Sequence, residues 1–169
     1  MTRQGPLNVG DVFSSSAGNL PSRAIIHAVG PKWKDGNSGE MDALRKAVYN
    51  SLQCAAGQRL ASVAIPAIGA GTYKLPVARV CDVIVGTVND FLTEKPRCSI
   101  REVYFIDITA ATAQGFAEAL RGSFKECDFI SCKLDKSGRS TPQQAAGGER
   151  RGNVADKERG NSTQFVLMM

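Results

Sequence analysis

The chain has 169 residues, a mass of 18.0 kDa and a formal net charge of +5, which suits one domain with an additional segment. No apolar run reaches the roughly 18 residues of a membrane span, and the first residues carry no apolar stretch typical of a secretory signal. Five cysteines, an odd number without a CxxC pair, argue against a disulfide scaffold and for a reducing compartment. We therefore expect no membrane partner.

The positive charge is concentrated toward the C-terminus. Lys and Arg outnumber Asp and Glu by 12 to 10 up to Leu120 and by 9 to 6 beyond it. A basic balance can indicate a nucleic-acid partner, but no aromatic side chains are interspersed with these charges as base stacking requires. A solvated linker with scattered cations is favoured over nucleic-acid binding.

The first half of the chain predicts two strands followed by a helix. Residues 10–13 indicate a weak strand, and the short apolar run 23–29 indicates a clearer one. Residues 40–56 predict a helix because apolar side chains recur every three or four positions. Asn37 suits a capping box at its start, and Gly57 suits a C-terminal cap.

The second half continues the alternation. Strands are expected at 62–65 and at 102–108, the latter so apolar that both of its faces should be covered. Pro76 opens a second helix, and Thr109 caps a third that ends before Gly122. This order predicts an α/β protein with a layered sheet, whose ligands collect where strands end.

The composition changes in the last third of the chain. Residues 133–163 contain almost no aliphatic or aromatic side chain larger than alanine, so they cannot bury enough apolar surface to offset the entropy of ordering. The apolar residues 165–169 are either the first strand of a following domain or an accident of where the sequence stops. We expect a folded domain over 1–125 and a disordered linker over 126–169.

The segment 66–76, between a strand and a helix, carries the strongest functional signal. Two glycines and an alanine let a ligand approach the backbone, and the helix N-terminus supplies unpaired N–H groups. Together they suit a phosphate or diphosphate. Thr72 adds a hydroxyl, Tyr73 a flat face and Lys74 a cation. The segment lacks the third glycine of a dinucleotide fingerprint and the Gly-Lys-Ser/Thr of a P-loop, so a turn without a ligand remains an alternative.

Other polar residues give weaker signals. His27 is the only histidine and lies in an apolar strand, so a satisfied sheet histidine is favoured over a catalytic one. We predict no metal site, because zinc needs clustered His and Cys, and no catalytic residue, because 14–16 lack a nucleophile elbow. Asp107, at a strand end, either contacts a ligand or caps a turn. Trp33 is expected to anchor packing.

Several stretches together resemble a macrodomain, from about residue 5 to residue 121. The resemblance is strongest for the repeated macrodomains of large mono-ADP-ribosyltransferases. It rests on VGDV at 9–12, SAGNLP at 16–21 and IIHAVGPKW at 25–33, on the second phosphate-binding loop at 63–73 with Pro76, and on the last strand and helix at 103–107 and 112–120.

The resemblance implies a three-layer α/β fold with a mixed sheet flanked by helices. It also implies binding of ADP-ribose or mono-ADP-ribosylated proteins, no further cofactor, and a parent transferase of the nucleus or cytoplasm that uses NAD and regulates transcription or antiviral signalling. The adenosine end would lie near Asp107 and Ile108. The diphosphate and ribose would contact Ile68, Gly69, Ala70, Gly71, Thr72 and Tyr73.

The chain also departs from the family pattern. The family's first ligand loop, with Asn-Ala-Ala-Asn and triple-glycine stretches, does not occur in it, and the first strands are missing. In the family, a strand from that region lies between those expected here at 23–29 and 62–65. Two strand pairs should therefore face each other across a gap with unpaired apolar edges. We hypothesise that the chain is a fragment. Gly69 and Ala70 also replace the usual hydroxyl residues, and Lys74 replaces a glycine.

Three functions follow from these features. The favoured one is a module that binds ADP-ribose. A hydrolase that removes ADP-ribose from proteins is the second, although it would need the absent first loop. An α/β interaction domain without a ligand is the third.

Overall fold

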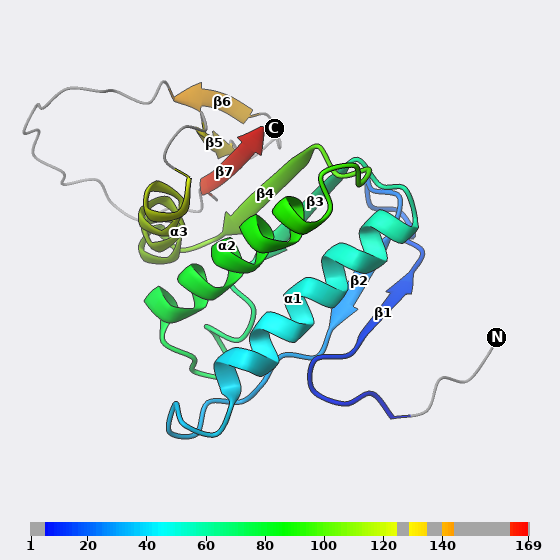
Figure 1. The fold of residues 1–169 in the computed structure, drawn as a ribbon. Helices are drawn as coiled ribbons and strands as arrows, with labels where there is room; N and C mark the ends of the chain where they lie inside the picture. Colours follow the sequence, from blue (N-terminus) through cyan, green and yellow to red (C-terminus); the bar gives the residue numbers. More distant parts are fainter. Residues whose placement is uncertain (1–5, 125–128, 135–139, 144–162, 169) are drawn as a thin grey trace, which may run out of the picture.

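The structure, a computed structural model, describes residues 6–124, 129–134, 140–143 and 163–168. An antiparallel two-stranded sheet contains β1 (Val12–Ser15) and β2 (Ile25–Ala28). A five-stranded sheet has the order β3–β4–β7–β5–β6 and is mixed, because only β3 and β4 pair in parallel (Figure 1). Its strands are β3 (Ser62–Pro66), β4 (Glu102–Asp107), β5 (Phe129–Leu134), β6 (Ser140–Gln143) and β7 (Thr163–Met168).

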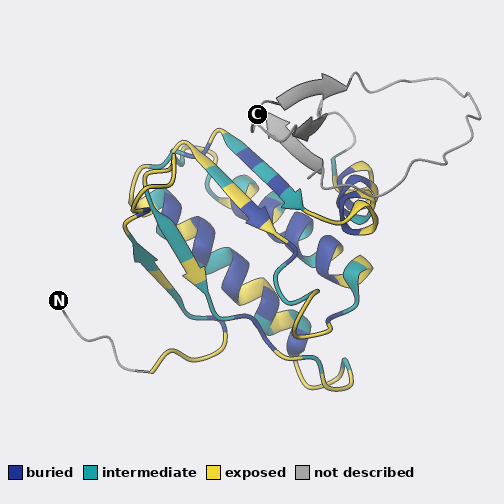
Figure 2. Ribbon diagram, turned by 180° about the vertical axis from the view of Figure 1, so that it is seen from behind, coloured by how far each residue is buried: buried dark blue, intermediate teal, exposed yellow. Residues whose placement is uncertain are grey.

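Three helices, α1 (Glu40–Gly57), α2 (Val77–Glu94) and α3 (Ala110–Ser123), cover one face of β1 to β4. The predicted apolar stripes are confirmed, because they supply most of the core. The opposite face of β1 to β4 has no helix over it in the described residues (Figure 2). The α/β fold with a mixed sheet is thus confirmed, with one helical layer here instead of the two expected. The stripe residues that are buried are Leu44, Val48, Leu52, Ala55, Val80, Cys81, Ile84, Val88, Phe91, Ala113, Phe116, Ala117 and Leu120.

Close contacts hold the helical layer to β4. The rings of Phe105 and Phe116 lie 5.2 Å apart between their centroids. A Cβ on Gly115 would come within 3.1 Å of the Cys81 sulfur, so glycine lets α3 approach α2 closely.

Burial, helped by the nearby charge of Asp82, raises the pKa of Cys81 to about 12. No helix in the described ranges is long and apolar enough to cross a membrane.

The capping box predicted for α1 is wrong. The N-cap is Gly39, which has no side chain that could cap the helix. Instead the carboxylate of Glu40, which is 3% exposed, accepts hydrogen bonds of 2.9–3.1 Å from four backbone amides in the preceding loop. Burial raises the pKa of Glu40, but hydrogen bonds from the backbone of Glu40 itself and of Gly36, Lys34 and Asp35 outweigh burial and lower the pKa to about 2. The four amides belong to Lys34, Asp35, Gly36 and Ser38.

The helix ends also differ in part from the predictions. Gly57 is the last residue of α1 and not its cap, and the chain turns instead through Arg59, whose φ is +55°. Gly122 lies inside α3, which continues to Ser123. The start of α3 is as predicted, because the Thr109 side chain accepts a hydrogen bond from the backbone of Thr112.

Three segments of the expected linker over 126–169 are strands. β7 pairs antiparallel with β4 along its whole length, from Asp107 opposite Thr163 to Glu102 opposite Met168. β5 pairs with both β7 and β6. The physical reason is the outer edge of β4, which offers unpaired backbone groups that an extended segment can satisfy. The rest of that linker prediction falls outside the described residues.

Replacing Glu40 with glutamine should reduce stability in a pH-dependent way. The pKa of Glu40 is lowered in the folded protein, so its contribution is complete above pH 4.5 and is lost as the pH falls toward 2. Thermal melts of both proteins should therefore differ most near neutral pH and converge toward pH 2. Glu118→Gln, at an exposed site on α3, is the control. An unchanged gap between the melts at all pH values would contradict this role.

Deleting residues 163–169 should expose only one side of β4. The amide of Glu102 donates to Ala61, on the β3 side, and alternation therefore directs the amides of Val103 and Phe105 toward β7. Hydrogen exchange at those two amides should accelerate by roughly tenfold, about 1.4 kcal/mol. Exchange at Tyr104, on the β3 side, is the internal control. Equal effects on both sides would contradict the pairing.

Candidate functional site

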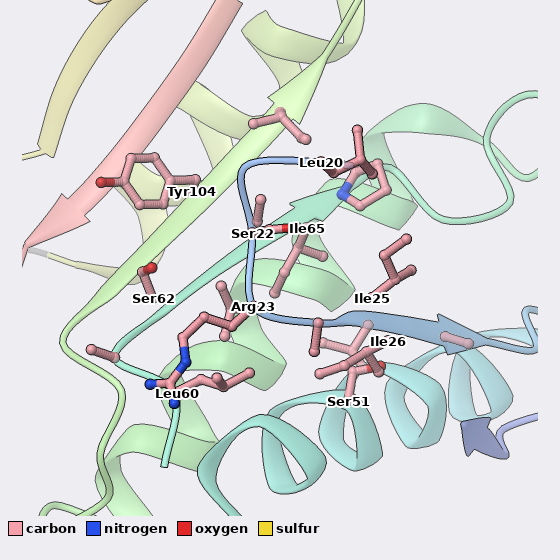
Figure 3. Close-up of a pocket in the computed structure, with 18 of the residues that line it drawn as sticks. Leu20, Ser22, Arg23, Ile25, Ile26, Ser51, Leu60, Ser62, Ile65 and Tyr104 are labelled. Atoms are coloured by element: carbon pink, nitrogen blue, oxygen red, sulfur yellow. The ribbon is translucent and has the colours of Figure 1, made fainter. Parts of the chain in front are cut away.

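Three loops leave the sheets at one edge. β3 and β4 are parallel, with Pro66 opposite Ile106, and β2 points the same way (Figure 3). The segments that follow these strands therefore lie side by side. Two contacts join the segment after β2 to the segment after β3. The Trp33 amide donates to the Tyr73 carbonyl at 3.0 Å, and a Cβ on Gly30 would lie 2.9 Å from the Ile68 side chain.

The loop between β3 and α2 is shaped by its own backbone. The Leu75 amide donates to the Gly69 carbonyl at 3.0 Å, and the Lys74 amide donates to the Gly71 carbonyl at 3.0 Å. Gly69 has a φ of +84°, a conformation that favours glycine. Leu75 is 2% exposed and anchors the loop in the core. The loop is therefore preformed without a ligand.

The predicted diphosphate residues divide into two groups. The amides of Ile68 and Ala70 donate to backbone carbonyls of the same loop. The other four amides donate no hydrogen bond within the described part of the chain. Backbone donors are thus available at four of the six predicted positions. These four are Gly69, Gly71, Thr72 and Tyr73.

The N-terminus of α2 follows this loop directly. Its N-cap is Pro76, which makes no side-chain capping bond, and its first turn contains no acidic residue. The amides of that turn and the helix dipole are therefore available to an anion from outside the helix. Loop and helix end together have the backbone geometry that suits phosphate groups.

Cationic and aromatic side chains border the site. The Lys32 ammonium lies 6.0 Å from the centroid of the Tyr73 ring, and Tyr73 is 39% exposed. The Arg79 guanidinium lies 6.0 Å from the Trp33 ring, which packs against the core as predicted. Neither Lys32 nor Arg79 was predicted from the sequence as a residue of this site. The signal for Lys32 was available, since it follows a strand at the predicted ligand edge.

Comparison with known proteins gives the family. A sequence profile of the Macro domain family matches residues 1–84. An O-acetyl-ADP-ribose deacetylase of Escherichia fergusonii is 40% identical over 104 residues, covering 62% of this chain and 58% of that protein. The solved structure of an Oceanobacillus iheyensis macrodomain mutant with ADPR has a TM-score of 0.65 and 27% identity, covering 71% of this chain and 63% of the other.

The chain belongs to the macrodomain family. It is also 37% identical over 125 residues to the human protein mono-ADP-ribosyltransferase PARP14, covering 73% of this chain but 7% of that protein. The resemblance to the macrodomain family that the sequence predicted is confirmed, and its finer likeness to the macrodomains of mono-ADP-ribosyltransferases stays a prediction. The chain spans less than two thirds of the length of each of these relatives.

The gap predicted for this macrodomain is present. β2 and β3 belong to separate sheets and are not hydrogen-bonded to each other. The region between them is an open cavity lined by both strands and by α1.

Asp107 performs the turn role that was one of its two predicted alternatives. Its Oδ1 accepts hydrogen bonds of 2.8 Å from both the amide and the hydroxyl of Thr109. Ile108, the next residue, is 83% exposed. Contact of Asp107 and Ile108 with an adenosine stays a prediction.

His27 is satisfied within the β1–β2 sheet, as predicted. Its Nε2 lies 2.9 Å from the Ser15 hydroxyl, and its ring stacks on Phe13 with centroids 5.2 Å apart. No carboxylate contacts His27 in the described ranges, so it has no acidic partner of the kind a catalytic triad requires. Those ranges also contain no cluster of His, Cys, Asp or Glu that could hold a metal ion.

Two substitutions separate the turn role of Asp107 from ligand contact. Asp107→Ala should lower the free energy of unfolding by about 1 kcal/mol, because two hydrogen bonds to Thr109 are lost. Asp107→Asn keeps the accepting oxygen and should cost much less. Urea unfolding measures both. Equal losses would contradict the turn role, and an effect of Asp107→Asn on ligand affinity alone would identify a contact.

Proposed function

We propose that this macrodomain binds ADP-ribose, free or attached to a protein, through the loop between β3 and α2. The observation that carries the proposal is the group of free backbone amides at Gly69, Gly71, Thr72 and Tyr73, directly before the uncapped N-terminus of α2. Such an arrangement suits a diphosphate, because amides and helix dipole both point toward negative charge. It requires no cofactor.

The side chains around the loop suit the rest of such a ligand. The exposed ring of Tyr73 offers a flat apolar surface for a ribose, and Lys32 beside it offsets phosphate charge. Lys74 adds a second exposed cation. Support from similarity comes from the Oceanobacillus iheyensis macrodomain, which has been solved with ADPR and with ADP.

The parent protein is proposed to be a mono-ADP-ribosyltransferase of the nucleus or cytoplasm that uses NAD and acts in transcription or antiviral signalling. The similarity to human PARP14 supports this assignment. Within such a protein the module would bind mono-ADP-ribosylated partners, while the transfer reaction would take place elsewhere.

Hydrolysis is the second candidate function, either of O-acetyl-ADP-ribose or of ADP-ribose attached to proteins. It is favoured by the relatives named O-acetyl-ADP-ribose deacetylase, from Escherichia fergusonii and other bacteria. Against it, His27 is engaged by Ser15 and Phe13, and the Cys81 thiol is buried with a raised pKa. We therefore favour binding without turnover.

Gly71→Glu should weaken ADP-ribose binding by about 100-fold, because like charges brought together cost several kcal/mol. A Cβ at Gly71 meets no atom within 4 Å, so the fold should be retained. Gly71→Gln is the matched control, with the same shape and no charge, and should bind more tightly than Gly71→Glu. Calorimetry with ADP-ribose measures the affinities.

AMP serves as a comparison ligand in the calorimetry, and O-acetyl-ADP-ribose serves as the substrate in a test for hydrolysis. AMP lacks the diphosphate and should bind more weakly than ADP-ribose. No heat with either ligand would contradict the binding proposal, and full binding by Gly71→Glu would contradict the site. Release of acetate from O-acetyl-ADP-ribose by the wild-type chain, followed by chromatography, would favour the second function.

A further inference from the structure

Two cations lie over two aromatic rings at the ligand edge, and these pairs cross between two segments. Lys32 follows β2, and its ammonium lies 6.0 Å from the centroid of the Tyr73 ring, in the loop before α2. Arg79 is the third residue of α2, and its guanidinium lies 6.0 Å from the ring of Trp33, which follows β2. Each segment therefore supplies one cation and one ring, and each cation lies over the ring of the other segment.

Backbone contacts fix the spacing of this arrangement. The Trp33 amide donates to the Tyr73 carbonyl at 3.0 Å, so the two residues that carry the rings are joined directly. A Cβ on Gly36 would lie 2.7 Å from the Trp33 ring and 3.1 Å from a guanidinium nitrogen of Arg79, so the loop after β2 packs closely on that pair. Because the cations rest on rings, an anion that binds them has less side-chain freedom to remove.

No carboxylate neutralises the two cations. Both are exposed, and neither forms an ion pair within the part of the chain that the structure describes. Asp35 is the one acidic residue between positions 31 and 39, and its carboxylate accepts a hydrogen bond of 2.8 Å from the Asn37 amide. Lys34 and Lys74, on the same two segments, are exposed and add to the positive charge. We call this surface the basic rim; it consists of Lys32, Lys34, Lys74 and Arg79.

The basic rim lies at the end of the proposed ligand site that faces β2. β3 lies between β2 and β4, so a ligand that crosses the loop after β3 has one end on each side (Figure 1). The adenosine end is predicted near Asp107 and Ile108, at the end of β4. The terminal ribose at the other end would then lie beside Tyr73. A protein modified with ADP-ribose is attached through that ribose, so its chain leaves the site past the basic rim.

Carboxylates suit this rim better than nucleic-acid bases do. Bases stack on free ring faces, but Lys32 covers one face of Tyr73, and the other face is the one proposed for the ribose. The Trp33 ring lies under Arg79 and packs against the core. An Arg guanidinium can bind a carboxylate through two parallel hydrogen bonds, and a Lys ammonium through one charged bond. An acidic peptide therefore satisfies the cations without needing a ring.

We propose that the basic rim recognises the peptide around the modified residue, and that this macrodomain prefers ADP-ribose attached to a segment with Asp or Glu within about three residues of the attachment point. About three extended residues span roughly 10 Å, which is enough to pass from the ribose to the cation 6.0 Å from the Tyr73 ring. The proposal rests on the proposed ADP-ribose function, because the attached ligand brings the peptide to the rim.

Two ADP-ribosylated peptides test this preference. Both carry fluorescein and one ADP-ribose on a central serine. The acidic conjugate has the sequence Gly-Glu-Glu-Ser-Glu-Glu-Gly, and the neutral conjugate has glutamine in place of each glutamate. Anisotropy with the full chain should show roughly tenfold tighter binding of the acidic conjugate, since exposed ion pairs each contribute up to about fivefold. Raising NaCl from about 0.05 M to about 0.5 M should reduce this preference, because salt screens exposed charges.

Two double variants with the same change in net charge locate the preference. Lys32→Gln with Arg79→Gln should reduce it to about twofold or less. The ratio of the two affinities is compared, so any change in the binding of ADP-ribose itself cancels. Arg59→Gln with Arg97→Gln is the matched control, because these exposed residues lie before β3 and after α2, at the opposite edge. The control should keep the tenfold preference, and thermal melts check that both variants are folded.

Charge reversal gives a second, independent variant. Lys32→Glu with Arg79→Glu should reverse the preference toward a conjugate that has lysine at the four flanking positions. A glutamate in the first turn of α2 is favourable for the helix, so the reversal should leave α2 folded. An unreversed preference would overturn the assignment to these two residues.

The outcomes separate this proposal from the function on which it rests. Equal affinity of the wild-type chain for the acidic and neutral conjugates would overturn this proposal alone. Absence of binding of free ADP-ribose and of both conjugates would overturn the proposed function, and this proposal with it. Fluorescein-labelled oligouridine that binds more tightly than the acidic conjugate, and loses its binding in Lys32→Gln with Arg79→Gln, would overturn the proposal in favour of a nucleic acid.

Discussion

β3 and β4 run in parallel, with Pro66 opposite Ile106, and the placement of the whole ligand edge follows from that pairing. Parallel neighbours need a crossover between them, and α2 is that crossover. A crossover helix that starts after β3 has its N-terminus at the edge where β3 ends. The helix dipole, the loop before it and the end of β4 are therefore brought together by topology.

The same pairing explains how the core supports the site. α2 can return across the sheet only by burying an apolar stripe, and Val80, Ile84 and Phe91 are fully buried. Phe105 of β4 packs on Phe116 of α3, which extends the same layer. Leu75 joins this core directly before α2 begins. The loop is consequently anchored by packing at one end and by the strand at the other.

Because the loop is anchored, its backbone amides can serve as the hydrogen-bond donors that side chains supply in other anion sites. The amides of Ala70, Lys74 and Leu75 shape the loop, so the remaining amides stay free for a ligand. Glycine and alanine at 69 and 70 in place of hydroxyl residues therefore leave the main donors in position. In the proposed ADP-ribose site, discrimination between ligands would fall to the groups at the rim, chiefly Tyr73 and Lys32.

Local features of the fold were predictable from the sequence, and features set by distant segments were not. The three helices follow from apolar periodicity, and Pro76 and Thr109 mark two of their starts correctly. The partners of Glu40 were missed because its carboxylate turns back to the preceding loop, and a spacing rule sees only one such partner. The pairing of β7 with β4 joins residues about 60 positions apart, which no local pattern encodes.

The strand edges of this fold differ in whether they are paired. The outer edge of β4 needs a partner on one side only, and β7 supplies it. β2 and β3, in contrast, face each other across an open cavity and share no hydrogen bond. A strand between them would have to pair on both sides at once, which is a stricter requirement than pairing with β4 alone.

The loops that follow β2 and β3 are joined at the edge where both strands end. The Trp33 amide donates to the Tyr73 carbonyl, and Gly30 lies close to the Ile68 side chain. Because β2 and β3 share no hydrogen bond along their lengths, these two contacts hold the loop before α2 against the segment that follows β2. The position of the loop therefore depends on both sheets and not on β3 alone.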